Sequence, residues 1–238
     1  MKKSVLIIKG HSKTDVELIN DRKIIQLYID FFTSNAGGCF DFDSEIFILE
    51  EPELQTIKEL AFLNSNDYLI LLLVGHGANK DGIQIFQLTK DLLIQPGQLQ
   101  FECERQLQII ESCRNVIDFE LDIKRINRLI PKYAYGGYIK RPLTREESLI
   151  KFNEALANSD KGIVYVFACN IGESAYSYFF LQVLVDVSIY LHEYFREQIY
   201  SIADIFGHVE KQVVDLSKGN QTPIKMGDSD FPFVVTII

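Results

Sequence analysis

Apolar residues in this chain form short, uninterrupted runs separated by polar segments. The longest run, residues 68–74, has no helical period and is followed at once by Gly75. Such a run is typical of a central strand in a parallel sheet, where both faces of the strand are buried. Similar runs predict further strands at residues 4–9, 45–49, 162–168 and 231–237, and a shorter strand that ends at residues 109–110.

Helices are predicted between these runs: residues 16–34 and 202–216 have the apolar spacing of amphipathic helices, whereas residues 173–195 predict a long apolar helix. The predicted helices cover residues 16–34, 144–158, 173–195 and 202–216, and a short helix begins at residues 51–53 and ends near Leu63, with Pro52 in its first turn. Thr14 or Asp15 can cap the first helix, and Thr144 with Glu147 forms a capping box. Asp81-Gly82 predicts a turn whose second arm covers residues 83–88. The alternation of strands and helices predicts an α/β fold with a parallel sheet covered on both faces.

Composition restricts the class of protein. The chain has 238 residues, with 47% hydrophobic and 24% charged, which is typical of one globular α/β domain over residues 1–238. No apolar run reaches transmembrane length, and the N-terminal run is interrupted by Lys9 without a cleavage site, so we expect a cytoplasmic protein without a membrane partner. The net charge of −9 argues against a nucleic-acid partner. Four cysteines without C-x-x-C spacing predict reduced thiols, and we expect no metal or other cofactor.

Two residues able to carry nucleophilic chemistry follow predicted strands. His76 comes after the run 68–74, and Cys113 comes after residues 109–110. Because the carboxyl ends of parallel strands line the binding crevice of an α/β sheet, neighbouring strands would place these two residues side by side, as a Cys/His dyad requires. Taken singly, a histidine or a cysteine at such a position is more often structural. Cys169 is a competing nucleophile, whereas Cys39 and Cys103 have no activating neighbours in the sequence.

The order of these motifs resembles that of the caspase-like peptidases, the group that contains caspases, metacaspases and their bacterial relatives. Gly75-His76-Gly77 stands where that group has S-H-G or G-H-G, and residues 109–115 stand where it has I-I-Q-A-C-R-G or D-S-C. Residues 168–175 resemble the segment that opens the small-subunit half, and residues 221–223 followed by 231–233 resemble the metacaspase-like tail. The resemblance implies a caspase-like three-layer α/β/α sandwich with a mostly parallel central sheet of about six strands. It also implies a large-subunit-like part at about 1–130, a linker at about 131–146 and a small-subunit-like part at about 147–238.

The same resemblance assigns roles to individual residues. The backbone amides of Gly77 and Cys113 would form the oxyanion hole. Metacaspases carry an acid two positions before the nucleophile and select Arg or Lys; here Glu111 stands at that position, while His11 replaces the arginine by which caspases select Asp. An alternative is that Glu111 points away and only pairs with a cation such as Arg114. The residues implied to contact substrate are Glu111, His11, Asp15, Phe167, Ala168, Cys169 and Asn170.

Two functions from different classes follow. The first is a cysteine endopeptidase that uses His76 and Cys113 to cleave protein or peptide substrates after Arg or Lys. The resemblance implies a regulated bacterial stress, defence or cell-death pathway, in which a regulatory protein is a possible partner. The second is a catalytically silent interaction module with a caspase-like fold. Residues 115–142 form a long region without clear periodicity, which is typical of a functional loop. Its basic residues, with Arg145 in the next segment, make Lys140, Arg141 and Arg145 candidate self-cleavage positions; the sequence determines neither a calcium requirement nor an oligomeric state.

Overall fold

The central sheet is mostly parallel and its main path contains six strands. The structure is a computed structural model that describes residues 1–80, 83–113, 143–170, 173, 179–194 and 199–236. Along the main path the strands follow the order β2-β1-β3-β6-β7-β9, and only the pairing of β7 with β9 is antiparallel. These strands are β1 (Lys3–Lys9), β2 (Ile46–Glu50), β3 (Tyr68–Lys80), β6 (Arg105–Cys113), β7 (Gly162–Phe167) and β9 (Ile224–Met226).

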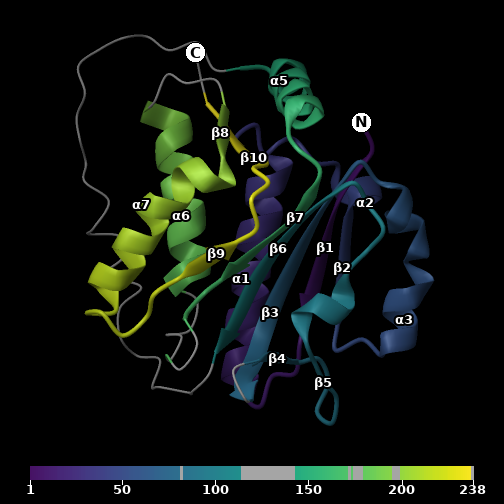
Figure 1. Ribbon diagram of the computed structural model, residues 1–238, viewed down its shortest axis with the longest axis vertical. Helices are drawn as coiled ribbons and strands as arrows, with labels where there is room; N and C mark the ends of the chain where they lie inside the picture. Colours follow the sequence, from purple (N-terminus) through teal and green to yellow (C-terminus); the bar gives the residue numbers. More distant parts are fainter. Residues whose placement is uncertain (81–82, 114–142, 171–172, 174–178, 195–198, 237–238) are drawn as a thin grey trace.

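Helices cover the two faces of this sheet and complete three layers (Figure 1). One face packs against α1, α5, α6 and α7, and the other packs against α3 and two 3-10 helices. The described helices are α1 (Asp15–Thr33), α2 (Phe42–Glu45), α3 (Leu54–Glu59), α5 (Arg145–Asn158), α6 (Phe179–Tyr194), α7 (Ile202–Leu216), η1 (Ala61–Ser65) and η2 (Pro96–Leu99). The predicted three-layer α/β/α architecture is therefore confirmed.

Alternation along the strands creates two hydrophobic cores. In β3, Ile70, Leu72 and Val74 face the core that contains α1 and α6. Leu69, Leu71 and Leu73 face the core that contains α3. All six side chains are at most 1% exposed, because successive side chains of a strand point to opposite faces and both faces are covered.

The starts of α1 and α5 show the capping interactions that their sequences encode. At α5, Thr144 accepts a hydrogen bond from the Glu147 amide, and the Glu147 carboxylate accepts one from the Thr144 amide, as the sequence predicts. At α1, Thr14 rather than Asp15 is the N-cap, and Glu17 completes a capping box of the same kind. Each box satisfies amides that a helix leaves unpaired at its first turn.

Three predicted boundaries were wrong. Strands β3 and β6 continue past the apolar runs, so His76 and Cys113 lie inside strands rather than after them, because inter-strand pairing extends through both residues. The short helix predicted from residues 51–53 to Leu63 begins later, at Leu54, and is divided at Leu60 into α3 and η1.

Two further sets of short strands are described, one next to β3 and one in a separate sheet. Strand β3 turns into a hairpin with β4 (Ile83–Gln87), as predicted, and β4 pairs with β5 (Leu93–Ile94). The last predicted strand is observed as β10 (Pro232–Val235), which pairs with β8 (Ile199–Ser201) in a separate two-stranded sheet.

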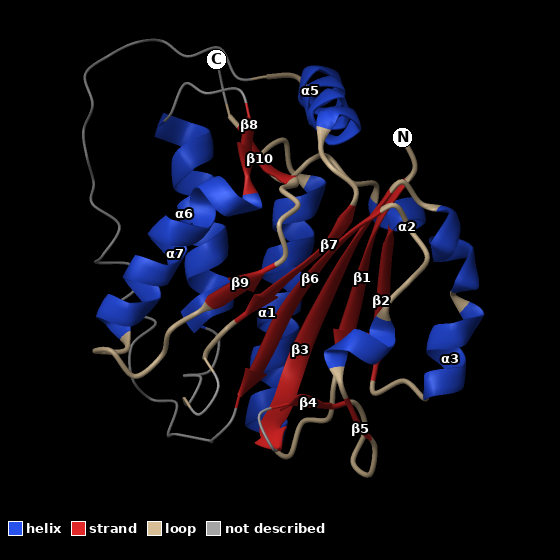
Figure 2. Cartoon of the chain, viewed as in Figure 1, coloured by secondary structure: helices blue, strands red, loops and turns tan. Residues whose placement is uncertain are grey.

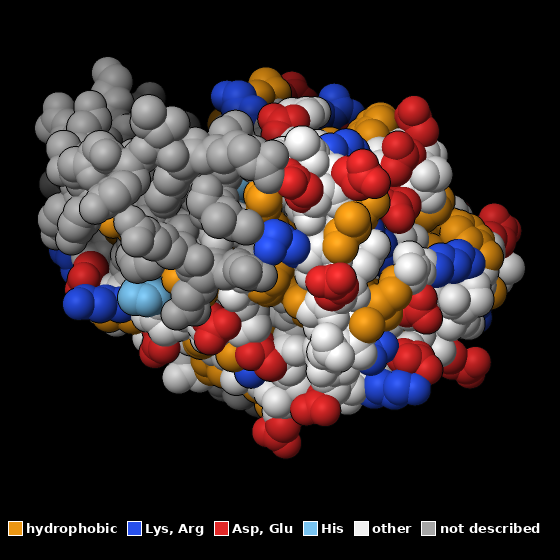
Figure 3. All heavy atoms as spheres, turned by 90° about the horizontal axis from the view of Figure 1, so that it is seen from above, with side chains coloured by type: hydrophobic (Ala, Val, Ile, Leu, Met, Phe, Trp, Pro, Cys, Tyr) orange, Lys and Arg blue, Asp and Glu red, His pale blue; other side chains and the backbone are white. Residues whose placement is uncertain are grey.

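The end of the molecule that carries the amino ends of the parallel strands has a mixed surface (Figure 3). On its described part, acidic side chains are dispersed among fewer basic ones and among apolar atoms. In the described part of the chain, no helix combines the length and the hydrophobicity needed to cross a membrane.

Candidate active site

Five neighbouring parallel strands, β2, β1, β3, β6 and β7, point toward the same edge of the sheet (Figure 2), and most of the sequence-predicted site residues lie there. In the ladder between β3 and β6, His76 is the direct partner of Cys113, and Val74 is the partner of Glu111. The backbones of the predicted dyad are therefore adjacent. The Cys113 side chain lies outside the described part of the structure.

Both glycines that flank His76 are required by the local backbone. Gly75 has φ +152°, and a Cβ there would lie 3.2 Å from the Cα of Gly10. A Cβ on Gly77 would lie only 2.4 Å from the Cβ of Ser112 on β6. Side chains rarely adopt the φ of Gly75, and real Cβ atoms do not approach as closely as 2.4 Å, so the Gly-His-Gly sequence allows β3 to pass close to Gly10 and to β6 around His76.

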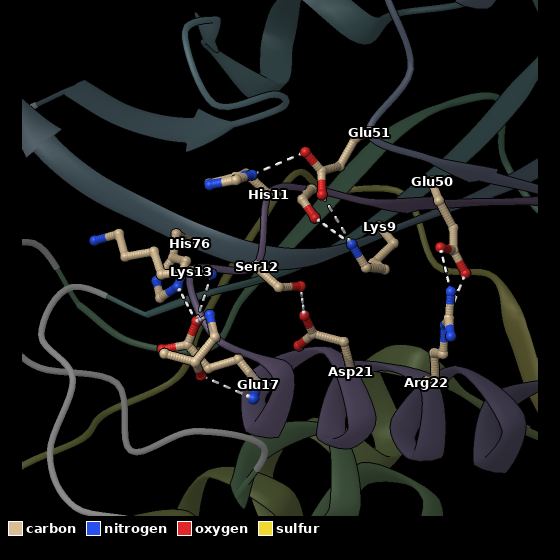
Figure 4. Close-up of polar contacts among 12 residues, drawn as sticks. Lys9, His11, Ser12, Lys13, Glu17, Asp21, Arg22, Glu50, Glu51 and His76 are labelled. Carbon is tan, nitrogen blue, oxygen red and sulfur yellow. Dashed lines mark hydrogen bonds and ion pairs between the residues drawn. The ribbon is translucent and has the colours of Figure 1, made fainter.

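His76 contacts an acidic residue that the sequence analysis did not select. Its Nε2 lies 3.0 Å from Oε2 of Glu17, in the first turn of α1. The His76 and Glu17 side chains are 14% and 21% exposed, so the pair is largely shielded from solvent. Figure 4 shows the two side chains meeting beside Lys13, at the point where α1 begins. The signal that could have identified Glu17 is the Thr-x-x-Glu capping box, which fixes the carboxylate at the start of the helix.

The Glu17 carboxylate is held in its ionised form. Burial opposes the charge, but hydrogen bonds from His76 and from the amides of Lys13 and Thr14 outweigh burial, so the pKa of Glu17 lies below its usual value. The two amide nitrogens lie 2.7 Å and 3.2 Å from the same oxygen that contacts His76. The partial positive charge at the start of a helix favours a carboxylate in the same way.

Glu111 is buried in the sheet face that packs against α1. It is 1% exposed and lies two positions after Ile109 along β6, which places both side chains on the sheet face that packs against α1 and α6. Burial, followed by the negative charges of Glu111 and Asp186, raises the pKa of the Tyr28 phenol on α1. Asp186, on α6, is therefore a second carboxylate whose negative charge acts on the Tyr28 phenol together with that of Glu111.

The carboxyl end of β7 lies beside that of β6. The Ala168 amide donates to the Ile110 carbonyl at 3.0 Å, which extends the pairing of the two strands beyond Phe167. The side chain of Gln221 donates to the Ala168 carbonyl at 2.9 Å and ties the C-terminal segment to this edge. Ala168 and Cys169 are buried and Asn170 is exposed, so Asn170 is the member of this group that solvent reaches.

His11 and Asp15, two of the residues implied to contact substrate, lie in different surroundings from His76. The Nδ1 of His11 lies 2.8 Å from Glu51, and the buried Lys9 ammonium lies 3.5 Å from the same carboxylate. Figure 4 shows the His11 side chain turned toward Glu51 rather than toward Glu17. Asp15 is exposed in the first turn of α1. The side chain of His11 therefore pairs with Glu51 and not with Glu17, the residue that contacts His76.

Burial affects the three other described thiols, Cys39, Cys103 and Cys169. Burial raises the pKa of Cys103 to about 11 and also raises the pKa of Cys39, where Arg145 and Lys3 only partly compensate. Cys169 is 5% exposed and its Sγ faces the Glu173 carbonyl at 3.8 Å. A thiol that stays protonated is a weak nucleophile, which favours a structural role for Cys39 and Cys103.

The self-cleavage candidates divide into two groups. Lys140 and Arg141 lie outside the described residues. The Arg145 guanidinium donates to the carbonyls of Thr33, Cys39 and Phe40 at 2.8 Å, 2.9 Å and 3.2 Å, so this side chain anchors α5 to the segment after α1. Within the described residues, no group of three or more His, Cys, Asp or Glu side chains could hold a metal ion.

Comparison with known proteins identifies the fold. No protein-family model and no curated protein sequence matches this chain. Its structure is similar to the crystal structure of the Drosophila initiator caspase Dronc, with a TM-score of 0.53 at 11% sequence identity, over 94% of this chain and 78% of that chain. The chain therefore has a caspase-like fold, as the resemblance in its motifs implied.

Proposed function

We propose that this protein is a cysteine endopeptidase in which Cys113 is the nucleophile and His76 is the general acid and base. The observation that carries the proposal is the direct pairing of His76 with Cys113 at the carboxyl ends of adjacent parallel strands, within a caspase-like fold. This edge of an open α/β sheet is where ligands commonly bind. The close packing at Gly77 further fixes the backbone on which His76 is presented.

The proposed reaction uses these residues in sequence. The Cys113 thiol gives its proton to His76, and the thiolate attacks the carbonyl carbon of the scissile bond. The amides of Gly77 and Cys113 would donate to the oxygen that becomes negative. His76 then returns the proton to the leaving amine, and water hydrolyses the acyl-enzyme with His76 as the base.

We further propose that substrates carry Arg or Lys before the scissile bond. Support comes from the burial of Glu111 two residues before the nucleophile, on the sheet face that also presents His76. A carboxylate in a desolvated cleft favours a cationic side chain, since charge-assisted hydrogen bonds are strong and bidentate with arginine. Ala168 and Asn170 follow β7 at the same edge of the sheet, and we propose that their main-chain groups contact the substrate.

The substrate class we propose is protein or peptide, in keeping with the fold shared with an initiator caspase. A regulated bacterial stress, defence or cell-death pathway, with a regulatory protein partner, is proposed on the resemblance in the motifs alone.

Cleavage profiling tests the proposed function. Purified full-length wild type and Cys113→Ala are incubated with the same peptide library, and mass spectrometry identifies the new termini. We expect cleavage after Arg or Lys in the wild-type sample only. A folded wild type that leaves the whole library intact would instead favour the catalytically silent interaction module.

A further inference from the structure

The carboxylate of Glu17 is positioned by the backbone before it meets His76. The capping box at Thr14 directs the side chain back over the first turn of α1, and the amides of Lys13 and Thr14 donate to Oε2. Thr14 Oγ1 accepts the Glu17 amide at 3.2 Å and completes the box. The oxygen that faces His76 therefore has little freedom to move.

The contact joins two elements that are distant in the sequence. Glu17 and His76 are 59 residues apart, and their 3.0 Å contact connects the start of α1 to the carboxyl-terminal half of β3 (Figure 4). Exposed ion pairs contribute little because solvent screens them. This pair is largely buried, its carboxylate is ionised, and its imidazole is the one adjacent to Cys113 in the strand ladder.

The chemistry of the two groups determines which imidazole nitrogen carries the proton. An ionised carboxylate only accepts hydrogen bonds, so the nitrogen that faces it, Nε2, must be the donor. In a neutral imidazole the other nitrogen, Nδ1, is then the acceptor. We propose that Glu17 is the positioning residue of the site, which holds neutral His76 as the Nε2–H tautomer and leaves Nδ1 to exchange a proton with the Cys113 thiol and the leaving amine.

This inference deepens the proposed function and rests on it. When Nδ1 takes the thiol proton, the imidazole becomes a cation, and the adjacent Glu17 carboxylate stabilises that charge while it remains ionised itself. When Nδ1 protonates the leaving amine, the ring returns to the Nε2–H form. Glu17 neither gains nor loses a proton in either step, so its role is orientation and charge stabilisation.

A second capping box in the chain offers a matched control. Glu147 occupies the same position relative to Thr144 that Glu17 occupies relative to Thr14. Figure 1 shows α5 at the end of the sheet opposite the carboxyl ends of β3 and β6. Glu147→Gln therefore makes the same chemical change to a helix start without touching His76, and it separates the loss of a cap from the loss of a positioning residue.

The first measurement reads the tautomer without using activity. Long-range 1H–15N NMR spectra are recorded on full-length protein labelled with 15N-histidine, at about pH 8.5, where imidazoles are mostly neutral. The chain has four histidines, and His76→Asn assigns the His76 signals by their loss. We expect the Nε2–H pattern in wild type and in Glu147→Gln, and a shift toward the Nδ1–H pattern in Glu17→Gln, whose amide can donate to Nε2.

The second measurement separates kcat from KM on a peptide that the library experiment identifies. Glu17→Gln should lower kcat by about 100-fold, within the range of general acid and base catalysis, with KM changed by less than about threefold. An Nδ1–H pattern in wild type, or an unchanged tautomer and kcat in folded Glu17→Gln, would overturn the role of Glu17. Absence of peptidase activity from wild type would overturn the proposed function, while the spectra would still report on Glu17 and His76.

Discussion

His76 and Cys113 are direct partners in the parallel ladder between β3 and β6. If they act as a dyad, replacing either residue should abolish peptidase activity and leave the fold intact. We expect Cys113→Ala and His76→Ala to lower kcat/KM by about 1,000-fold or more, because a nucleophile and its base act as a unit. His208→Ala, which changes an exposed histidine of α7, is the control and should retain wild-type activity. Activity is measured on the same peptide, with circular dichroism to verify folding; a fully active Cys113→Ala would disprove the dyad.

Alkylation should select Cys113 among the four thiols. The pKa of Cys103 is raised to about 11 by burial, the pKa of Cys39 is raised as well, and Cys169 is buried, so these three should react slowly. Limiting iodoacetamide should therefore modify Cys113 first and remove activity in proportion, faster as pH rises. Peptide mapping by mass spectrometry gives the order of modification. Early labelling of Cys39 or Cys103 with activity retained would contradict the assignment of Cys113 as the reactive thiol.

Basic specificity should depend on Glu111. Glu111→Gln should weaken cleavage after Arg by about 2 kcal/mol, or about 30-fold in kcat/KM, which is the scale of a buried charged contact. Glu59→Gln makes the same change in net charge at an exposed position of α3 and should have no such effect. Matched peptides with Arg, Lys or Asp before the scissile bond provide the measurement. A wild-type preference for Asp would contradict the proposal.

Lys3 should make stability depend on pH. Its ammonium lies 4.0 Å from the centre of the Phe40 ring, and burial lowers its pKa from 10.5 to about 8. Between about pH 8 and about pH 10.5 the unfolded chain binds a proton that the folded chain has released, so this lysine's contribution to the free energy of unfolding rises with pH. Below about pH 8 both states are protonated and the contribution is constant.

Lys3→Met removes that dependence. The free energy of unfolding of wild type, minus that of Lys3→Met, should therefore become more positive between about pH 7 and about pH 9.5, as measured by urea unfolding. Lys58→Met, at an exposed position of α3, is the control and should keep the pH dependence of wild type. A difference between wild type and Lys3→Met that stays constant over this range would show that Lys3 is not the titrating group.

Self-processing is expected at the bond between Lys140 and Arg141. The resemblance of the motifs implies that these residues stand where caspases carry the linker that is cut during maturation, and a protease with basic specificity would accept them. The alternative bond after Arg145 is disfavoured, because it lies in the first turn of α5 and the Arg145 side chain holds three backbone carbonyls. Intact-mass analysis after long incubation should show two fragments divided near residue 140 in wild type but not in Cys113→Ala. An uncut wild type that is fully active would show that this region is not a maturation site.

The sequence by itself determined the class of fold and the adjacent placement of His76 and Cys113. The uninterrupted run at residues 68–74 can be buried on both faces only in a covered sheet, so it predicted the central strand β3. The Thr144 and Glu147 pair marked the start of α5 because a capping box depends on residues three positions apart. His76 and Cys113 were predicted to meet because parallel strands end at one edge, a rule that needs no knowledge of side-chain packing.

Tertiary structure decided what depends on contacts between distant segments. The three-residue strand β9 is too short to show a period of its own, and it exists by pairing with β7. His11 contacts Glu51, which is 40 residues further along the chain, after α1, α2 and β2. No local sequence pattern indicates this contact. Glu17 could be seen in the sequence as part of a cap, but only the folding of α1 against β3 brings its carboxylate to His76, because that contact depends on where the whole helix lies on the sheet.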